Sequence, residues 1–184
     1  PSIEDPKTTH DINVNGTLNI LIAARDAGVS RVIYSASSSA YGNQEKLPLS
    51  EDMKPMPLSP YGLQKYIGEL ECGLFSQIYN LETVSLRYFN VYGPRAPMGG
   101  AYSLVIGKFL EQRKNGESLT IVPDGKQSRD FTHVKDVVRA NILASESLLA
   151  GKGDVVNIGG GRNYSVLEIA DIIGGPKIFI EPRL

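Results

Sequence analysis

Two residues with complementary chemistry, Tyr61 and Lys65, stand four positions apart in a segment that is predicted to be helical. Residues four apart on a helix share one face and lie about 6 Å apart. A lysine ammonium near a phenol stabilises the phenolate, which lowers the pKa of the tyrosine from about 10 toward neutrality. Such a tyrosine can remove a proton from a hydroxyl group near physiological pH. The pair therefore predicts a general base.

A run of serines, Ser37 to Ser39, follows an apolar segment, Arg31–Ser35, that is predicted to be a buried strand. Ligands of open α/β sheets bind at the carboxyl ends of the strands, so these hydroxyls are predicted to face a ligand. A serine there could hold the same hydroxyl group that Tyr61 deprotonates. Simpler explanations compete, because a tyrosine–lysine pair at this spacing also arises by chance and serines at a strand end usually hydrogen-bond turn backbone.

The elements that must position these residues alternate between helix and strand. A first helix is predicted from Asp5-Pro6 to Gly28 and a second from Ser59-Pro60 to about Tyr79, each with a capping residue before a first-turn proline. Strands that alternate with helices predict a mainly parallel sheet with right-handed crossovers, an α/β fold. The remaining strands are predicted at 83–89, 119–122, 155–158 and 177–181, and the remaining helices at 103–114, 134–149 and 165–173.

The composition is that of a globular protein and excludes several function classes. Of 184 residues, 41% are hydrophobic and 21% charged, and the net charge is -1. The sequence has no stripe of basic residues that could bind a phosphate backbone, so nucleic acid is not expected as a partner. No apolar run approaches the roughly 18 residues that span a bilayer, so a membrane is not expected either. The single Cys72 and a start without a leader-like segment predict a cytoplasmic protein. His10 and His133 are isolated, which predicts no metal site.

Several ordered motifs along the chain resemble those of a known family. Besides the serine run and the tyrosine–lysine pair, they are Asn13-Val14-Asn15-Gly16-Thr17, Arg87-Tyr88-Phe89-Asn90, Ser128-Arg129-Asp130-Phe131 and Asn157-Ile158-Gly159-Gly160. Together they resemble the extended short-chain dehydrogenase/reductases (the NAD-dependent epimerases and dehydratases), and within them the UDP-glucose and UDP-N-acetylglucosamine 4-epimerases. The resemblance covers essentially the whole chain. It implies a Rossmann-like, doubly wound parallel sheet with a small C-terminal substrate-binding part.

The resemblance also implies roles for individual residues. Tyr61 would be the general base, Lys65 would bind the nicotinamide ribose, and Ser37 matches the catalytic serine, so all three would lie against NAD. Phe89 matches a residue at the nicotinamide end of the cofactor, and Arg129 matches an arginine that meets the substrate diphosphate. The other positions that match substrate contacts are Ser38, Ser39, Asn90, Leu104, Val105, Thr120, Val122 and Arg183.

The implied reaction interconverts UDP-glucose and UDP-galactose, or their N-acetyl forms, with NAD as the cofactor. A hydride leaves C4 of the sugar while Tyr61 takes the C4 hydroxyl proton, and the hydride returns to the other face of the 4-keto sugar. Related 4,6-dehydratases carry an Asp-Glu pair where this chain has Ser38 and Ser39, which disfavours dehydration, although another epimerase or dehydratase of the superfamily is an alternative. The resemblance further implies a homodimer in which helices 5–27 and 61–79 form a four-helix bundle.

The chain departs from this family at its start. Nothing supplies the first strand and glycine-rich turn for the pyrophosphate, and the glycine cluster at 159–161 lacks the spacing of such a turn. We therefore expect residues 1–92 to be the C-terminal part of a dinucleotide-binding domain with the catalytic residues, and residues 93–184 to be the substrate-binding part with a returning helix and strand. Without the first strands, segment 31–35 would form an exposed apolar edge. An inactive fragment that serves only as a binding or structural remnant is the other alternative.

Overall fold

The computed structural model describes residues 2–97 and 104–181. The described chain packs into two units. Residues up to Tyr88 form the first unit together with Val137–Ile158, and Phe89–Asp136 form the second with the residues from Gly159 onward. A helix and a strand thus return to the first unit. The assignment of 1–92 to the cofactor and 93–184 to the substrate stays a prediction.

The first unit is built on a parallel sheet with the strand order β1-β2-β7. Its strands are β1 (Arg31–Ser37), β2 (Glu82–Tyr88) and β7 (Lys152–Ile158). The pairing register aligns Ala36, Arg87 and Asn157 in one row across the sheet. Because paired residues of parallel strands point to the same face, this row shares one face of the sheet. β1 forms one edge of the sheet, as predicted for segment 31–35.

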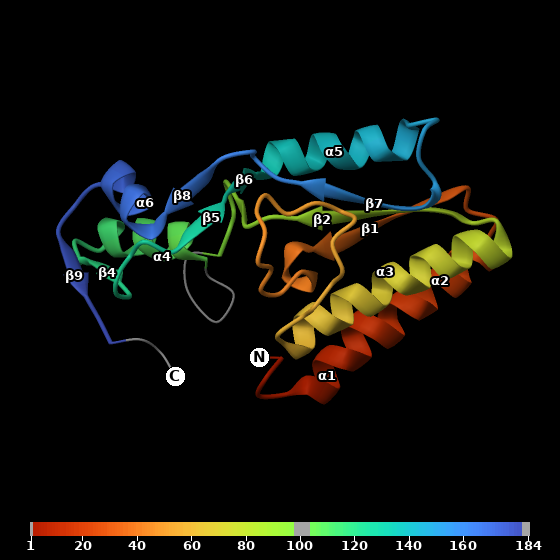
Figure 1. The fold of residues 1–184 in the computed structure, drawn as a ribbon, viewed down its shortest axis with the longest axis horizontal. Helices are drawn as coiled ribbons and strands as arrows, with labels where there is room; N and C mark the ends of the chain where they lie inside the picture. Colours follow the sequence, from red (N-terminus) through yellow and green to blue (C-terminus); the bar gives the residue numbers. More distant parts are fainter. Residues whose placement is uncertain (1, 98–103, 182–184) are drawn as a thin grey trace. The chain divides into compact units, whose positions relative to one another are not determined.

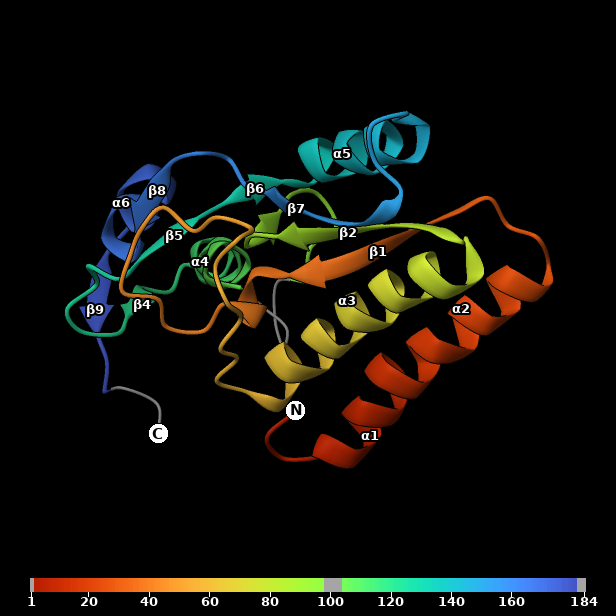
Figure 2. The same ribbon diagram turned by 45° about the vertical axis from the view of Figure 1, so that its right-hand side comes forward.

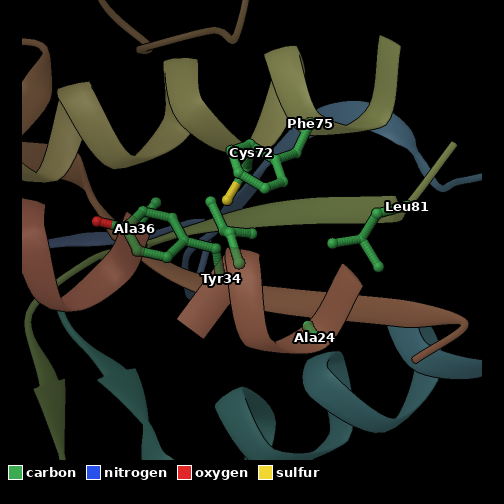
Figure 3. Packing of buried hydrophobic residues seen from close by; sticks show 7 residues of the cluster. Ala24, Tyr34, Ala36, Cys72, Phe75 and Leu81 are labelled. Carbon is green, nitrogen blue, oxygen red and sulfur yellow. The ribbon is translucent and has the colours of Figure 1, made fainter. Parts of the chain in front are cut away.

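Helices cover both faces of this sheet (Figure 1). The helices α2 (Gly16–Asp26) and α3 (Pro60–Tyr79) lie side by side on one face, and α5 (Val134–Glu146) lies on the other, which the turned view confirms (Figure 2). The core between the sheet and the helix pair is a cluster of buried side chains (Figure 3), namely Leu21, Ala24, Tyr34, Ala36, Cys72, Phe75 and Leu81. The predicted α/β class with a parallel sheet is confirmed.

The start of the chain differs from the single helix that the sequence predicts. The helix α1 (Pro6–His10) passes through a π-helical turn, Asp11–Asn15, into α2. Asp5 caps α1 as expected, because its Oδ1 accepts a hydrogen bond from the N–H of Thr8 at 3.0 Å. A π turn inserts one residue without ending the helix, so the apolar periodicity does not show it.

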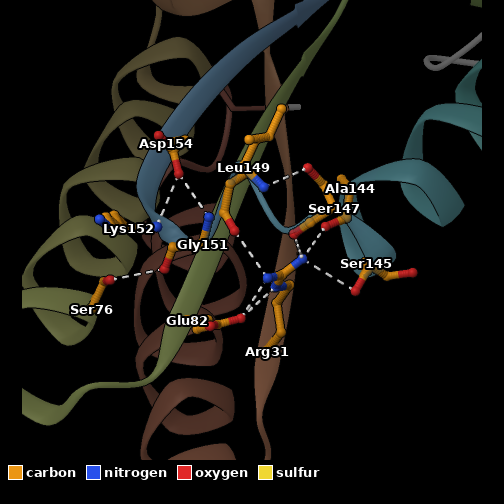
Figure 4. Close-up of polar contacts among 11 residues, drawn as sticks. Arg31, Ser76, Glu82, Ala144, Ser145, Ser147, Leu149, Gly151, Lys152 and Asp154 are labelled. Carbon is orange, nitrogen blue, oxygen red and sulfur yellow. Dashed lines mark hydrogen bonds and ion pairs between the residues drawn. The ribbon is translucent and has the colours of Figure 1, made fainter.

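The helix α5 ends at Glu146, so the predicted end at Leu149 is wrong. Leu148 and Leu149 are each 98% exposed. Arg31 of β1 caps the helix end, and its guanidinium also pairs with Glu82 of β2 (Figure 4). A helix end has carbonyls without an intrahelical partner, and a guanidinium satisfies several at once. The oxygens that accept from Arg31 belong to Ala144 (2.7 Å), Ser145 (3.2 Å), Ser147 (2.8 Å) and Ala150 (2.9 Å).

In the described part of the second unit, short strands form three pairs. β3 (Val91–Tyr92) pairs in parallel with β6 (Thr132–His133), and β4 (Leu119–Ile121) pairs in parallel with β9 (Lys177–Phe179). The third pair, β5 (Ser128–Asp130) with β8 (Asn163–Ser165), is antiparallel.

Two helices pack against these strands, α4 (Val105–Lys114) and α6 (Val166–Ile173). The capping box predicted at the start of α6 is confirmed, since Ser165 and Glu168 each bond the backbone N–H of the other. The core of the unit consists of Phe109, Leu119, Ile121, Val166, Ile169 and Ala170. Within the described ranges, no helix is both long enough and apolar enough to cross a membrane.

Candidate active site

The serine run lies at the carboxyl end of β1. Ser37 is the last residue of the strand, and a 3-10 turn, Ser38–Ala40, follows it. The Oγ of Ser37 accepts hydrogen bonds from the N–H of Ser39 at 3.2 Å and from the Oγ of Ser39 at 2.8 Å. The structural explanation for these serines therefore holds, because Ser37 caps the turn. The two donors occupy the acceptor positions of the Ser37 hydroxyl, which leaves its own proton to be donated to a ligand.

Tyr61 lies in the first turn of α3, next to this serine turn. The Oγ of Ser59 caps the helix by accepting from the N–H of Gly62 at 3.1 Å, and Pro60 fits the first turn. A Cβ at Gly62 would lie 2.7 Å from the carbonyl oxygen of Ser39, so only glycine permits this close approach. Tyr61 remains 41% exposed. The structure thus brings the turn that carries Tyr61 against the end of β1.

Lys65 lies one turn further along α3 and is half-buried. Its Nζ lies 4.6 Å from the centroid of the Tyr34 ring. Burial lowers the pKa of the Lys65 ammonium, while the nearby Cys72 and Glu69 act in the opposite direction. No described residue accepts a hydrogen bond from this ammonium. Its three N–H donors can therefore serve a ligand.

A buried ion pair links β2 to α3, the helix that carries Tyr61 and Lys65. Arg87 of β2 donates to Glu69 of α3 through Nη2 at 2.7 Å and through Nε at 3.0 Å, and both side chains are almost fully buried. Burial disfavours the charge, but the bonds to Glu69 outweigh it and raise the pKa of Arg87. The guanidinium also lies over the Tyr41 ring, 4.5 Å from its centroid, and the Tyr41 hydroxyl donates to Asn157 at 2.7 Å.

In the second unit, two predicted substrate residues already have structural bonds. The Nδ2 of Asn90 donates to the carbonyl oxygen of Asp130 at 2.9 Å. Asn90 also has a positive φ of 28°, which few residue types adopt readily. The Oγ1 of Thr120 accepts from Gln112 at 3.0 Å, and its N–H donates to the same side chain at 3.2 Å. These contacts explain the two residue types without a ligand.

The other predicted residues of the second unit are more open. Arg129 is exposed on β5, and the bond that it forms within the described residues is local, from Nη1 to the carbonyl oxygen of Ser128 at 2.8 Å. Leu104 is 44% exposed and precedes α4, whereas Val105 begins that helix and packs against the core of the unit. Phe89 and Val122 are half-buried and directly follow β2 and β4. Arg183 lies outside the described residues.

A pocket of about 290 Å³ opens in the second unit beside α4. Leu104 is the predicted site residue that lines it. Its other lining residues were not predicted from the sequence, in which the segment from Gly93 reads only as a glycine- and proline-rich loop. They are Tyr92, Gly93, Pro94, Arg95, Ala96, Pro97, Ile106, Gly107 and Leu110.

Two partners of the predicted catalytic residues were also missed from the sequence. The sequence predicts Tyr34, whose ring lies against the Lys65 ammonium, only as part of a strand, although the alternation of that strand puts it on the same face as Ala36. It predicts no role for Glu69, although Glu69 follows Lys65 by four residues and so shares its helix face. The face on which each residue lies could be predicted from its position in the strand or helix, whereas the contact between the strand and the helix could not.

Serines end a strand of the parallel sheet, and the adjoining helix carries a tyrosine and a lysine in its first turns. This arrangement is typical of the open α/β proteins, which bind ligands at the strand ends. The chain belongs to the NAD dependent epimerase/dehydratase family, whose model matches residues 1–159.

Relatives with known or inferred activities agree with this assignment. A putative UDP-glucose 4-epimerase of Methanocaldococcus jannaschii is 41% identical over 189 residues, which is 99% of this chain and 60% of that protein. The UDP-N-acetylglucosamine 4-epimerase of Methanobrevibacter ruminantium M1, solved with UDP-N-acetylmuramic acid, is 36% identical and superposes with a TM-score of 0.93, covering 99% of this chain and 60% of that one. The UDP-glucose 4-epimerase of Thermus thermophilus, solved with NAD, is 32% identical with a TM-score of 0.86, covering 99% and 61%.

These comparisons confirm the Rossmann-like fold and bound its extent. The chain spans about 60% of the length of the relatives that it matches. It therefore corresponds to part of the fold that those proteins have.

Proposed function

We propose that this chain carries the catalytic residues of an NAD-dependent UDP-sugar 4-epimerase that interconverts UDP-glucose and UDP-galactose or their N-acetyl forms. The observation that carries the proposal is the placement of Ser37, Tyr61 and Lys65 in one unit, at the end of β1 and the start of the adjoining helix. The serines at positions 38 and 39 leave no carboxylate there for an elimination reaction. A cytoplasmic location is part of the same proposal.

The side chains of this site divide the proton chemistry among them. Tyr61 accepts the proton of the C4 hydroxyl group and returns it at the end of the cycle. The Ser37 hydroxyl donates a hydrogen bond to the oxygen at C4 and keeps that oxygen in line with the phenol, while its own proton stays on the serine. The ammonium of Lys65 stabilises negative charge on Tyr61. The same residues serve both directions, because the starting sugar and the product differ only in their configuration at C4.

The residues present fit a dinucleotide. The Lys65 ammonium has three donors and no acceptor among the described residues, which suits the hydroxyls of a ribose. When bound, NAD supplies the hydride acceptor and donor for C4 of the sugar. Ser37, Tyr61, Lys65 and Phe89 are the residues of this chain that we assign to its nicotinamide half.

The second unit supplies the proposed contacts with the nucleotide and the sugar. Arg129 is exposed and has a forked set of donors, which fits a diphosphate. We assign Asn90, Leu104, Val105, Thr120 and Val122 to the rest of the substrate, with Ser38 and Ser39 near the sugar. We also assign Arg183, on the sequence alone, as a second arginine for the diphosphate.

We further propose that two copies of the chain associate through α2 and α3. Four apolar side chains stay exposed along one side of α3: Leu63 (49%), Leu70 (54%), Leu74 (52%) and Ile78 (58%). Their spacing by seven and four residues forms a stripe suited to helix packing. Ile12 (66%) and Ile20 (63%) are exposed on the neighbouring helical segment. A second copy with the same stripe would cover it and form a four-helix bundle.

The proposed function is tested by following UDP-glucose and UDP-galactose by NMR after addition of NAD. Two proteins are assayed: the 184-residue chain, and a fusion in which the parts of the Methanocaldococcus jannaschii relative that this chain does not match complete it, each in its own place in the order of the relative. Interconversion in either protein supports the proposal, and activity in the fusion alone assigns the chain as the catalytic part. No interconversion in either protein, with both folded, would contradict it.

A further inference from the structure

The side chain beneath Lys65 is Tyr34, which comes from the middle of β1. Both the side-chain ammonium and the backbone carbonyl of Lys65 contact Tyr34. The Lys65 Nζ lies 4.6 Å from the ring centroid, and the Tyr34 hydroxyl donates to the carbonyl oxygen of Lys65 at 3.4 Å. Tyr34 is 8% exposed and belongs to the core cluster that it shares with Cys72 of α3 (Figure 3). The ring is thus a fixed surface under the lysine.

The sequence of α3 makes room for this tyrosine. A Cβ at Gly68 would lie 2.2 Å from the Tyr34 hydroxyl, a distance that side chains do not tolerate. Gly68 therefore lets the phenol reach under the helix. Because glycine in the middle of a helix is destabilising by roughly 0.5–1 kcal/mol relative to alanine, the close approach explains why it is found there.

Among the described residues, no carboxylate forms an ion pair with the Lys65 ammonium, whereas the Tyr34 ring lies against it. Burial disfavours the ammonium, and the Glu69 carboxylate is bonded to Arg87. On α3, Cys72 also acts on the charge of the lysine and Tyr61 lies one turn before it, while the Tyr34 ring faces it from β1. The face of an aromatic ring attracts a cation, and the attraction is stronger when both are shielded from water.

We propose that Tyr34 is the positioning residue for Lys65: its ring face holds the ammonium, charged, at the turn of α3 that follows Tyr61. The inference rests on the proposed function, in which this ammonium binds the cofactor and stabilises charge on Tyr61. Tyr34 itself does not touch the reacting atoms. The Tyr34 hydroxyl contributes less to this placement, because its hydrogen bond to the Lys65 carbonyl is long. Removing the hydroxyl leaves the ammonium over the ring.

The experiment compares Tyr34→Phe, which keeps the ring, with Tyr34→Leu, which removes it. Phe75→Leu is the matched control, since Phe75 lies in the same core cluster but packs against Tyr79, with the two rings tilted by 56°. The signal of the Lys65 ε-CH₂ is followed by ¹H–¹³C NMR in the ¹³C-lysine-labelled chain as the pH is raised, and Lys65→Arg assigns it. This readout does not depend on enzymatic activity.

In the wild type and in Tyr34→Phe, the ring current shifts this signal upfield. Tyr34→Leu abolishes the upfield shift and raises the acid-dissociation constant of Lys65 roughly tenfold. Phe75→Leu changes neither quantity. An unchanged Lys65 signal in Tyr34→Leu, or the same change in Phe75→Leu, overturns the proposal. Should Tyr34→Leu fail to fold, Tyr34→Met replaces it as a non-aromatic variant of greater length.

The epimerase assay then separates this inference from the proposed function. Tyr34→Leu should lower kcat/KM about tenfold and move the alkaline limb of its pH profile to lower pH, because the ammonium is lost earlier. Tyr34→Phe and Phe75→Leu should keep the wild-type profile. A wild-type profile in Tyr34→Leu overturns the positioning role even if the enzyme is active. Inactivity of every protein, with the NMR result as expected, contradicts the proposed function and leaves the placement of Lys65 supported.

Discussion

Arg87 and Glu69 form a bidentate ion pair between β2 and α3, with Nη2 and Oε2 2.7 Å apart and side chains only 3% and 2% exposed. Removing one member of such a pair leaves a buried, uncompensated charge, which typically costs about 3–5 kcal/mol. We therefore expect Glu69→Ala to lower the free energy of unfolding by about this amount in urea titrations. Replacing both residues with apolar ones, Glu69→Leu with Arg87→Met, should cost less than Glu69→Ala alone.

The exposed pair Arg25–Asp26 provides the control for this prediction. Its side chains are 34% and 59% exposed. Asp26→Ala should change the stability by no more than about 1 kcal/mol, as exposed pairs do. An equally small effect of Glu69→Ala would mean that the buried pair does not hold β2 and α3 together.

A second prediction concerns Asp154 at the start of β7. Its Oδ2 accepts from the N–H groups of Gly151 at 2.7 Å and Lys152 at 2.9 Å (Figure 4). Burial alone would raise the pKa of this carboxyl group, but the bonds from Lys152 and Gly151 outweigh it and lower the pKa. A carboxyl group with a lowered pKa in the folded state adds stability above its unfolded pKa of about 3.9, and this stability is lost as the pH falls through the folded pKa.

Urea titrations at pH 7 and at decreasing pH below about 4 measure this effect. We expect the wild type to lose more stability over this range than Asp154→Asn, whose side chain does not titrate. The exposed Asp52→Asn should behave like the wild type, since within the described residues Asp52 accepts a bond from the Ser50 hydroxyl and none from a backbone N–H. Parallel pH curves for the wild type and Asp154→Asn would show that the two bonds do not favour the ionised carboxylate.

The proposed dimer is tested by a charge in the apolar stripe of α3. Leu74→Glu should turn a dimer into a monomer in light scattering at micromolar concentration, because the glutamate would be buried without a partner. Ile142→Glu is the matched control, since Ile142 is also half-exposed, at 51%, but lies on α5. A wild-type monomer, or a Leu74→Glu dimer, would contradict association through α2 and α3.

Arg129 is predicted to bind the substrate diphosphate. Arg129→Ala should raise KM for the UDP-sugar and weaken the binding of UDP, measured by calorimetry, with little change in kcat. The exposed Arg139 on α5 provides a control of the same charge, and Arg139→Ala should leave UDP binding unchanged. If Arg129→Ala also leaves UDP binding unchanged, Arg129 is not part of the diphosphate site.

Local signals explain what could be predicted from the sequence. The start of α3 and the capping box of α6 were predictable because Ser59-Pro60 and Ser165 with Glu168 act on their own first turns. The alternation of strands and helices was enough to predict the parallel sheet. The short pairs β3–β6 and β5–β8 escaped prediction, since each strand has only two or three residues and its partner is far away in the chain.

In the candidate site, too, some residues could be predicted from local signals and others could not. Residue types and a helical spacing pointed to Ser37, Tyr61 and Lys65, and the family resemblance gave their roles. The ring under Lys65 could not be predicted, because it depends on how β1 packs beneath α3. The bonds that occupy Asn90 and Thr120 were equally invisible, since both partners come from other segments of the second unit.

The measurement that tests the central claim most directly is the rate of UDP-glucose and UDP-galactose interconversion in Tyr61→Phe. It uses whichever protein is active, the chain or its fusion, and Tyr79→Phe at the far end of α3 is the control. The account predicts a loss of about 10²–10⁴-fold in kcat for Tyr61→Phe and no loss for Tyr79→Phe. A Tyr61→Phe enzyme with near-normal turnover would contradict the assignment of Tyr61 as the general base.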